Sequence, residues 1–283
     1  MQSTILHIQS KLQGLYPETE IKSFSQLIIE KLTGFSRNEI FLNKITLFSD
    51  EKRNIVDDFI EKLTKFVPIQ YILGETEFYG LLFYVNESVL IPRPETEELV
   101  DWIQNENQQN AQIQILDIGT GSGCIAIVLK HEFPASTVDA FDISEKALET
   151  AKRNAGRNNL EVNFSIVDIL NAPDFTDKWD IIVSNPPYIT EQEKNGILPN
   201  VLDHEPHLAL FVPDNDPLLF YRHIALFARQ HLFPNGKLYF EINREAGKSC
   251  VELLTELGYR DVELRKDISG NDRMVKAVFN SEV

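Results

Sequence analysis

The stretch Ile115-Leu116-Asp117-Ile118-Gly119-Thr120-Gly121-Ser122-Gly123 runs from a short apolar segment into a glycine-rich turn. The apolar segment predicts a buried strand, and residues 124–131 after the turn read as a helix. Glycines let the backbone approach a ligand closely, and open α/β sheets bind cofactors at the carboxyl ends of their strands. The stretch therefore predicts an α/β fold with a ligand-binding turn after its first strand.

The spacing of the glycines narrows the class of ligand. Gly119, Gly121 and Gly123 follow a Gly-x-Gly-x-Gly pattern, whereas dinucleotide-binding folds use Gly-x-Gly-x-x-Gly. Asp117 stands two residues before the first glycine, where it is poorly placed for a pyrophosphate. A cationic or zwitterionic ligand fits this turn better, and a purely structural tight turn is the open alternative.

Strands and helices alternate from residue 95 onward. The predicted strands are 112–117, 136–142, 162–169, 179–184 and 236–242, followed by 262–265 and 274–279. Alternation requires crossover connections, which predict a mainly parallel sheet with helices on both faces. No helix separates the last two strands, so they are expected to pair antiparallel. Residues 95–283 are thus predicted to form one Rossmann-like domain.

Residues 1 to about 70 have helical periodicity. Apolar residues form one stripe at Ile55, Val56, Phe59, Ile60, Leu63 and Phe66. Ser36 and Glu39 have the spacing of a capping box, and Gly34 suits the end of the preceding helix. Residues 1–75 are therefore predicted to form a small helical bundle.

Between the two predicted domains the pattern changes to β structure. Residues 77–86 are rich in aromatic and β-branched side chains. Asn86-Glu87-Ser88 supplies turn chemistry before Val89-Leu90-Ile91. We therefore expect a β-hairpin linker over residues 76–94.

The composition excludes several classes of protein. Hydrophobic residues make up 43% of the 283 residues and charged residues 25%, which is typical of a globular chain. Lys and Arg number 27 against 43 Asp and Glu, and the resulting net charge of −16 repels phosphodiester backbones. No direct nucleic-acid binding is expected, with a local basic groove left open as an alternative.

The cysteines, histidines and N-terminus indicate the cellular setting. Cys124 and Cys250 lie far apart within predicted regular elements, so we expect no disulfide and a reducing compartment. No basic leader opens the chain, and no uncharged apolar run approaches the roughly 20 residues that span a bilayer. His204 and His207 have no partners at metal-ligand spacing, so no metal site is expected. A soluble, cytoplasmic protein without a membrane partner is predicted.

Two further carboxylates follow predicted strands. Asp142 ends the second strand, and Asp168 lies near the end of the third. A carboxylate at the end of the second strand can accept hydrogen bonds from two ribose hydroxyls, and Asp168 lies where an adenine amine would sit. Either residue could instead be a helix N-cap. Together with Asp117 and the glycine turn, the two predict an adenosine ligand that carries no phosphate.

The segment Ser184-Asn185-Pro186-Pro187-Tyr188 lies at the end of the apolar strand 179–184. Two prolines remove two backbone donors and fix φ, so carbonyl oxygens and the Asn185 side-chain oxygen can form a rigid cluster of acceptors. Tyr188 adds an aromatic face. Such a cluster suits a planar –NH2 group, and an ordinary Pro-Pro loop is the alternative.

At these motifs the sequence resembles the S-adenosylmethionine-dependent methyltransferases with an Asn-Pro-Pro-Tyr motif, which modify planar amino nitrogens of adenine, guanine or glutamine. Within that class it is similar to the peptide-chain release factor glutamine methyltransferases, the HemK/PrmC family. The matching segments are 68–74, 78–80, 89–97, 117–123, 185–188 and 205–210. The Ile-Pro-Arg-Pro-Glu-Thr run within 89–97 discriminates best. At 211–216 the chain departs from the family's Gly-Gly-x-Asp-Gly turn, which leaves the conformation of this loop open.

The resemblance implies a class I methyltransferase fold and assigns roles to the site. Asp117, Gly119 and Gly121 would line the methionine part of S-adenosylmethionine, and Ile118 and Thr120 lie in the same turn. Asp142 would hold the ribose, Asp168 and Ile169 would lie at the adenine, and Asn185 would also border the cofactor.

The resemblance also implies the residues that grip the substrate glutamine, which are Asn185, Pro186, Pro187 and Tyr188. Of these, Asn185, Pro186 and Tyr188 would be catalytic. Arg93 could bind substrate or pair with a carboxylate of its own chain, and Glu241 could face the pocket or serve the structure alone.

The implied partners are class 1 release factors, recognised by residues 1–75, and a monomer is expected. A nucleic-acid amino methyltransferase, which would flip a base into the same acceptors, is the alternative enzyme. The net charge of −16 and the lack of a Lys/Arg-rich stripe argue against it. A third hypothesis is a non-catalytic adaptor that uses the same fold to bind partners. The presence of Asp142 and Asn185 argues against it.

Overall fold

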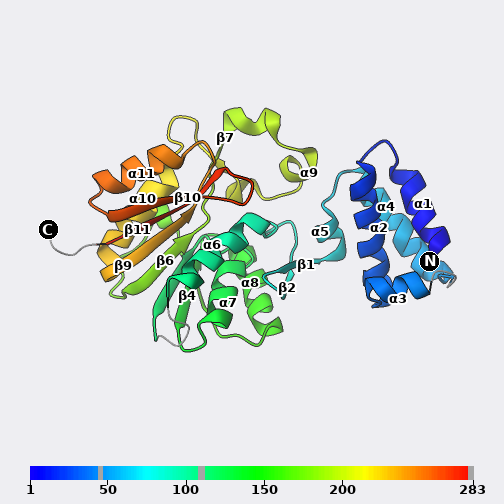
Figure 1. Ribbon diagram of the computed structural model, residues 1–283, viewed down its shortest axis with the longest axis horizontal. Coiled ribbons are helices and arrows are strands. Elements are labelled where there is room, and N and C mark those ends of the chain that lie inside the picture. The colour runs from blue at the N-terminus through cyan, green and yellow to red at the C-terminus, as the bar shows by residue number, and fades with distance from the viewer. Residues whose placement is uncertain (44–46, 108–111, 280–283) are drawn as a thin grey trace. The chain divides into compact units, whose positions relative to one another are not determined.

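The computed structural model describes residues 1–43, 47–107 and 112–279 (Figure 1). The predicted domains 1–75 and 95–283 also contain a few residues that the structure does not describe. The chain divides into two compact units, one of residues 1–74 with 198–204 and one of residues 75–197 with 205–283.

The first unit is helical, as predicted. Its helices are α1 (Gln2–Leu12), α2 (Glu18–Thr33), α3 (Arg37–Leu42), α4 (Asp50–Thr64), α5 (Ile69–Leu73) and the short α9 (Pro199–Leu202). Three members of the predicted stripe on α4, Val56, Ile60 and Leu63, are buried in its core. The burial of one apolar face against the other helices supplies most of the stability of such short helices.

Local signals at the start of α3 are confirmed. The Ser36 amide donates to Glu39 Oε2 at 2.8 Å, and the Glu39 amide donates to Ser36 Oγ at 3.4 Å, which completes the capping box. Gly34 ends α2 in the left-handed region with φ of 71°.

A β-hairpin opens the second unit, but its turn lies elsewhere than predicted. Strands β1 (Glu75–Phe78) and β2 (Leu81–Tyr84) pair antiparallel around Tyr79-Gly80, whose φ values are 52° and 73°. Two positive φ values are typical of a two-residue hairpin turn. The predicted turn at 86–88 exists but does not join two strands, because residues 89–91 are not a strand.

A seven-stranded sheet forms the centre of the second unit, in the order β10-β11-β9-β6-β3-β4-β5. The strands are β3 (Gln114–Ile118), β4 (Thr137–Asp142), β5 (Asn163–Ile166), β6 (Trp179–Ser184), β9 (Leu232–Glu241), β10 (Arg260–Lys266) and β11 (Asp272–Val278). The strands from β9 to β5 run parallel, and β11 is antiparallel to both of its neighbours. The predicted mainly parallel sheet with an antiparallel pair at its end is confirmed.

Two predicted strands differ from the structure by three or more residues at one end. The strand expected over 162–169 ends at Ile166, because Asp168 accepts a hydrogen bond from the Leu170 amide at 3.0 Å and begins the short helix η1 (Ile169–Asn171). The strand expected over 236–242 is longer at its start, since β9 begins at Leu232.

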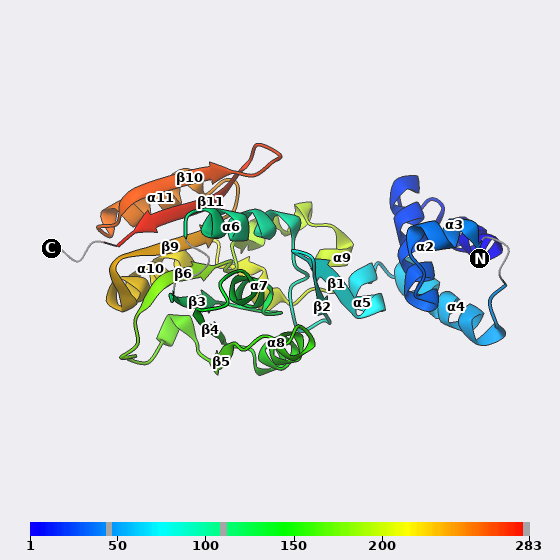
Figure 2. The same ribbon diagram turned by 60° about the horizontal axis from the view of Figure 1, so that its bottom comes forward.

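Helices cover both faces of the sheet (Figure 2). One face packs against α6 (Pro94–Asn105), α7 (Cys124–Glu132) and α8 (Glu145–Arg157), and the other against α10 (Leu219–His231) and α11 (Gly247–Glu256). Successive side chains of β3 point to opposite faces of the sheet. Ile115 packs in the core under α6 and α7, and Leu116 packs in the core under α10 and α11. Both side chains are fully buried, which places the end of β3 at the centre of the unit.

Shorter elements complete the second unit after β6. Strands β7 (Ile189–Thr190) and β8 (Phe211–Val212) pair parallel, and η2 (Glu191–Gly196) and η3 (His207–Ala209) lie between them in sequence. The loop 211–216, whose conformation the sequence left open, thus begins as β8, and Asp214 accepts a hydrogen bond from the Gln192 amide at 3.1 Å.

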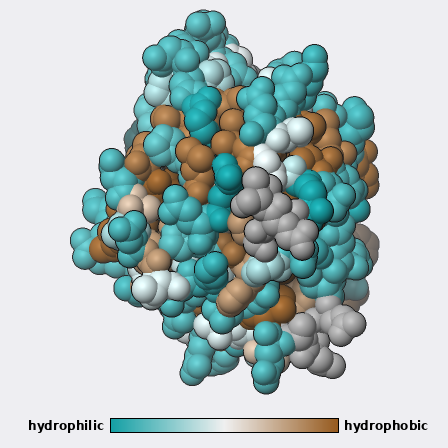
Figure 3. Space-filling view, turned by 90° about the vertical axis from the view of Figure 1, so that its left-hand side faces the viewer, coloured by the Kyte–Doolittle hydropathy of each residue, from teal (hydrophilic) through white to brown (hydrophobic). Residues whose placement is uncertain are grey.

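The surface is mostly hydrophilic on the face that Figure 3 shows, in keeping with the net charge of −16. Within the described residues, no helix is both long enough and apolar enough to cross a membrane.

Candidate active site

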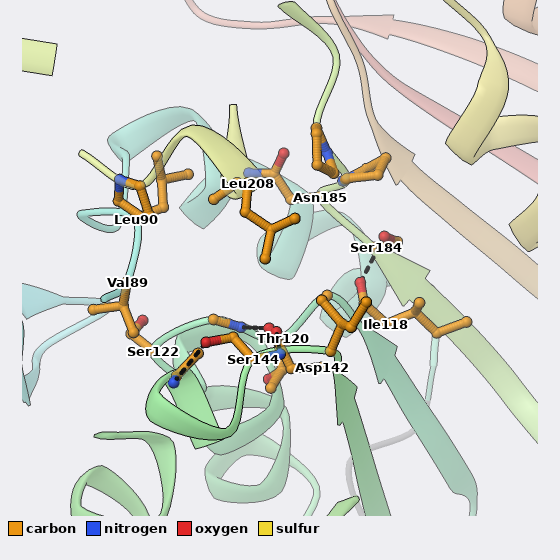
Figure 4. A pocket seen from close by; sticks show the side chains of 18 of the residues that line it. Val89, Leu90, Ile118, Thr120, Ser122, Asp142, Ser144, Ser184, Asn185 and Leu208 are labelled. Carbon is orange, nitrogen blue, oxygen red and sulfur yellow. Dashed lines mark hydrogen bonds between the residues drawn. The ribbon is translucent and has the colours of Figure 1, made fainter. Parts of the chain in front are cut away.

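A cavity of about 250 Å³ lies at the carboxyl ends of β3, β4 and β6. Its walls come from the glycine turn, the residues after β4, the Asn-Pro-Pro segment after β6 and residues 88–93. Figure 4 shows Asn185 and Leu208 on one side of the cavity, with Asp142 and Thr120 across from them. The predicted turn, acidic residue and acceptor segment therefore meet in one place.

The glycine turn is built from residues with positive φ. The φ values of Gly119, Gly121 and Gly123 are 74°, 56° and 80°, a region that other residues rarely adopt. A Cβ at Gly123 would also lie 2.9 Å from Ile127 Cδ1. The amides of Gly119 and Thr120 both donate to the Phe141 carbonyl oxygen, which fixes the turn against β4.

Asp142 ties the end of β4 to the glycine turn. Its Oδ2 accepts a hydrogen bond from the Gly121 amide at 2.8 Å, and its Oδ1 accepts one from the Ser144 amide at 2.9 Å. Burial raises the pKa of Asp142, while these amides favour its carboxylate. Ser144 caps α8, so the alternative that Asp142 is the helix cap is wrong. Each carboxylate oxygen keeps a further lone pair for a ligand.

Asp168 and Ile169 also line the cavity, beyond β5. Asp168 is a helix cap, which was the alternative prediction for this residue. Its Oδ1 accepts a hydrogen bond from the Leu170 amide, and its Oδ2 accepts one from Asn171 Nδ2 at 2.8 Å. A residue with both carboxylate oxygens engaged still has lone pairs free, so the cap and a contact with a ligand are compatible.

The Asn-Pro-Pro segment is held at the end of β6. Ser184 Oγ donates to the Ile118 carbonyl oxygen at 2.6 Å and so joins β6 to β3 beside the glycine turn. Asn185, Pro186 and Pro187 line the cavity. Tyr188 does not line it; this residue borders a second cavity, and its hydroxyl donates to Glu241 Oε1 at 3.3 Å.

Arg93 pairs with a carboxylate of its own chain. Its Nη2 donates to Glu205 Oε1 at 2.5 Å, and Glu205 Oε2 accepts from the Ile91 amide at 3.3 Å. The Glu205 side chain is 1% exposed and that of Arg93 is 32% exposed. The pair holds residues 91–93 against the start of the 205–210 segment, both of which line the cavity in part.

The chain is similar to known proteins over most of its length. Two family models match, "PrmC N-terminal domain" at residues 5–74 and "Methyltransferase small domain" at residues 95–206. A release factor glutamine methyltransferase of Flavobacterium psychrophilum is 49% identical over 271 residues, which cover 95% of each chain. This chain belongs to the release factor glutamine methyltransferase family.

Further comparisons support the family and the fold. A release factor glutamine methyltransferase of Bacteroides thetaiotaomicron is 48% identical over 272 residues, covering 96% of this chain and 97% of that one. A methyltransferase structure from Pyrococcus furiosus is 18% identical, covers 82% of this chain and 100% of that one, and has a TM-score of 0.53. That likeness is one of fold, and it agrees with the predicted class I methyltransferase sheet.

Asp117 lies beneath the cavity rather than in its wall. The residue is fully buried, its Oδ2 accepts from Thr120 Oγ1 at 2.6 Å, and its Oδ1 has no hydrogen-bond partner of ordinary geometry. Burial raises the pKa of Asp117 to about 7, although the Thr120 hydroxyl and the Ala126 amide favour its carboxylate. Its neighbours Ile118, Gly119, Thr120 and Gly121 line the cavity as predicted.

Asp117→Asn is expected to stabilise the ligand-free protein more at pH 8 than at pH 5. Because folding raises the pKa of Asp117 from 3.8 to about 7, the folded state holds an extra proton between these values. The free energy of unfolding of wild type therefore falls as the pH rises through this window, by on the order of 3 kcal/mol between pH 5 and pH 8. Asparagine does not titrate. Urea unfolding of both proteins at the two pH values tests this, and an equal difference at both would contradict it.

Thr96 belongs to the site although sequence reasoning did not single it out. It lies in the first turn of α6 and lines the cavity, and its hydroxyl donates to Glu241 Oε2 at 2.6 Å. Its only sequence signal was membership of the Pro-Arg-Pro-Glu-Thr run. Glu241, the last residue of β9, is 1% exposed and lies 145 positions away, so no local pattern joins the two.

Among the described residues, no group of three or more His, Cys, Asp or Glu side chains is placed to hold a metal ion. His204 Nε2 instead contacts the Lys65 carbonyl oxygen at 2.9 Å within the first unit. Cys124 lines the cavity, and burial raises the pKa of its thiol to about 12, so it remains protonated at neutral pH.

Proposed function

We propose that this protein transfers a methyl group from S-adenosylmethionine to the side-chain amide nitrogen (N5) of a glutamine in class 1 peptide-chain release factors. The observation that carries the proposal is the position of Asn185, on the wall of a cavity that also contains the glycine turn and Asp142. Family membership supports the same reaction, since relatives with this name align over almost the whole chain. The target is the glutamine of the Gly-Gly-Gln loop.

The chemistry of the cavity wall fits this cofactor. Among the described residues that line it, Arg93 is the one with a permanently cationic side chain, and Glu205 neutralises it. Asp142 and Asp168 are the acidic ones. A wall with carboxylates and no free cation suits a nucleoside that carries a positive charge and no phosphate. S-adenosylmethionine supplies an electrophilic methyl group on a positively charged sulfur.

Each cofactor residue has a distinct task in this proposal. Asp142 accepts hydrogen bonds from the ribose hydroxyls through its remaining lone pairs. Asp168 and Ile169 contact the adenine, and the glycine turn admits the methionine part. Asp117 does not line the cavity; it holds the Thr120 hydroxyl in place by accepting its hydrogen bond at 2.6 Å.

The acceptor segment orients the substrate. A carboxamide nitrogen is a poor nucleophile because its lone pair is delocalised, so catalysis depends on holding it in line with the methyl group, an effect of up to about 7–11 kcal/mol in favourable cases. The two N–H groups of the glutamine amide donate hydrogen bonds to the Asn185 side-chain oxygen and the Pro186 carbonyl oxygen. These contacts strengthen as positive charge develops on the nitrogen. The nitrogen gains the methyl group and loses one of its two protons to solvent, and S-adenosylhomocysteine is the other product. Tyr188 supports this segment from behind through Glu241.

The proposal is tested by incubating the purified protein with methyl-labelled cofactor and a release factor. Label should appear on the Gly-Gly-Gln glutamine by peptide mass mapping, and a release factor with that glutamine changed to alanine should remain unlabelled. Parallel reactions with tRNA, rRNA and duplex DNA test the nucleic-acid alternative. Label on nucleic acid with none on the release factor would overturn the proposed substrate.

Residues 1–75 are proposed to recognise the folded release factor, because one glutamine side chain offers too few contacts to select a protein. A chain that starts at residue 75 keeps all the residues that line the cavity. We expect it to bind the cofactor normally, and to lose at least about tenfold more kcat/KM on an intact release factor than on a Gly-Gly-Gln peptide. Cofactor affinity serves as the check on folding, because residues 198–204 lose their partners. Equal losses on both substrates would exclude a role in recognition.

We infer that the enzyme acts as a monomer in the cytoplasm, where release factors are found, and that it does not bind nucleic acid directly. The net charge of −16 supports the last point. Sedimentation of the protein alone, and in the presence of a release factor, measures both the oligomeric state and the partner.

A further inference from the structure

A buried series of hydrogen bonds lies behind Asn185. Its Nδ2 donates to Thr96 Oγ1 at 3.4 Å, Thr96 Oγ1 donates to Glu241 Oε2 at 2.6 Å, and Tyr188 OH donates to Glu241 Oε1 at 3.3 Å. Thr96 is 2% exposed and Glu241 is 1% exposed. A carboxylate is rarely buried to this degree without a compensating role, because its desolvation costs free energy.

We propose that Thr96 and Glu241 are positioning residues that determine which end of the Asn185 carboxamide faces the substrate nitrogen. The inference rests on the proposed function, in which the Asn185 oxygen accepts a hydrogen bond from the glutamine amide. It adds two residues, neither of which donates to or accepts from the substrate, that make this oxygen available.

The number of protons in the series fixes which way Asn185 faces. A threonine hydroxyl carries one hydrogen, and the short contact with Glu241 uses it. Thr96 Oγ1 therefore presents only lone pairs to Asn185, which must direct its –NH2 group at Thr96. The side-chain oxygen then occupies the other end of the carboxamide, as an acceptor. A flipped Asn185 would set two oxygens against each other and present donors to the –NH2 group of the substrate.

The direction of the series depends on Glu241 accepting from both hydroxyls. Burial raises the pKa of Glu241, whereas the Thr96 and Tyr188 hydroxyls and the nearby Arg273 charge favour its carboxylate. Arg273 is itself held in place, since its Nε donates to Asp267 Oδ2 at 3.1 Å. Each of the two Glu241 oxygens faces a hydroxyl, and this arrangement leaves Thr96 as the donor in the 2.6 Å contact.

The position of the three residues also suits a positioning role. Thr96 comes from the first turn of α6, Glu241 from the last position of β9, and Asn185 directly follows β6. β6 and β9 are adjacent and parallel, with Ser184 opposite Phe240, so the residues that come next, Asn185 and Glu241, lie at the same edge of the sheet. The series therefore attaches the acceptor segment to two rigid elements, which limits the orientations of the Asn185 side chain.

The test uses Thr96→Val, which keeps the shape of the side chain and removes the hydroxyl, and Thr96→Ser, which keeps the hydroxyl. We expect Thr96→Val to lower kcat by about ten- to a hundredfold, with cofactor affinity and KM for the release factor within about twofold of wild type. Thr96→Ser should recover most of the lost kcat. Normal kcat in Thr96→Val, or no recovery in Thr96→Ser, would overturn the proposal.

A double-mutant cycle separates positioning from a general effect on structure. If Thr96 acts through Asn185, the variant Thr96→Val/Asn185→Ala should be no slower than Asn185→Ala alone. A further drop equal to that of Thr96→Val would show that Thr96 acts by another route. Thr150→Val is the matched control, because Thr150 is 3% exposed and accepts from Asn86 Nδ2 at 3.2 Å away from the cavity wall. Its kcat should be that of wild type.

A second measurement needs no substrate. In ¹⁵N-labelled protein, the Asn185 side-chain amide resonances, assigned by their loss in Asn185→Ala, should shift and exchange faster with water in Thr96→Val and remain unchanged in Thr150→Val. Unchanged resonances in Thr96→Val would overturn the positioning role. If the wild-type enzyme does not methylate a release factor but the resonances do shift, the proposed substrate fails and the positioning of Asn185 stands.

Discussion

Asn185→Ala is expected to lower the kcat for methylation of a release factor by roughly 10²- to 10³-fold while leaving cofactor affinity near that of wild type. The carboxamide lies on the cavity wall opposite Asp142, and its –NH2 group bonds to Thr96. In the proposed function, the oxygen that this variant loses is the group that binds the substrate amide. An interaction that strengthens in the transition state lowers kcat more than it raises KM when it is removed.

Single-turnover rates with saturating cofactor measure the loss, and calorimetry measures cofactor binding. Asn163→Ala is a suitable control, because Asn163 starts β5 and bonds to Asp139 Oδ1 at the opposite end of the sheet from the cavity. Its turnover should match wild type. If cofactor affinity and turnover fell in parallel in Asn185→Ala, the residue would serve the cofactor and its assigned role in binding substrate would be wrong.

Local sequence patterns predict a structure correctly where neighbouring residues determine its conformation. The glycine turn, the Ser36 capping box and the bounds of β6 follow from residues close together in the chain, and the structure confirms them. The meeting of Asp142 and Asn185 in one cavity was also predictable, because the carboxyl ends of parallel strands lie at one edge of the sheet.

Contacts between distant residues account for what the sequence did not reveal. The hairpin turn at Tyr79 has a positive φ, and its amide donates to Glu97 Oε1 at 2.7 Å, 18 residues away. Thr96 and Glu241 are 145 positions apart, and Arg93 and Glu205 are 112 apart. No periodicity or spacing joins such pairs, because strand order and the docking of α6 decide which of them meet.

The departure of Tyr188 from its predicted place has the same origin. Its ring was expected to form part of the substrate pocket, but its hydroxyl bonds to Glu241, and the residue borders a second cavity with Asn243 and Arg273. The Asn243 Nδ2 group donates to the Tyr188 carbonyl oxygen at 3.3 Å, which further fixes this part of the chain. The proposed catalytic contribution of Tyr188 therefore acts through the position of the acceptor segment.

Asp142→Ala is expected to weaken S-adenosylmethionine binding by about 10²-fold or more. Two charge-assisted hydrogen bonds to the ribose would be lost, each worth about 1.5–3 kcal/mol. The Gly121 and Ser144 amides would lose their acceptor as well, so the glycine turn itself would be less well fixed. Asp142→Asn keeps one acceptor oxygen and should bind with intermediate affinity.

Calorimetry with each variant measures this directly, and the rise in unfolding temperature at fixed cofactor concentration provides an independent estimate of the same affinity. Asp139→Ala is the matched control, because Asp139 lies on the same strand, bonds to Trp179 Nε1 at 2.7 Å and does not line the cavity. Its loss is expected to lower the stability of the fold and to leave cofactor affinity unchanged. Wild-type affinity in Asp142→Ala would mean that the ribose lies elsewhere, and the assignment of this cavity to the cofactor would then fail.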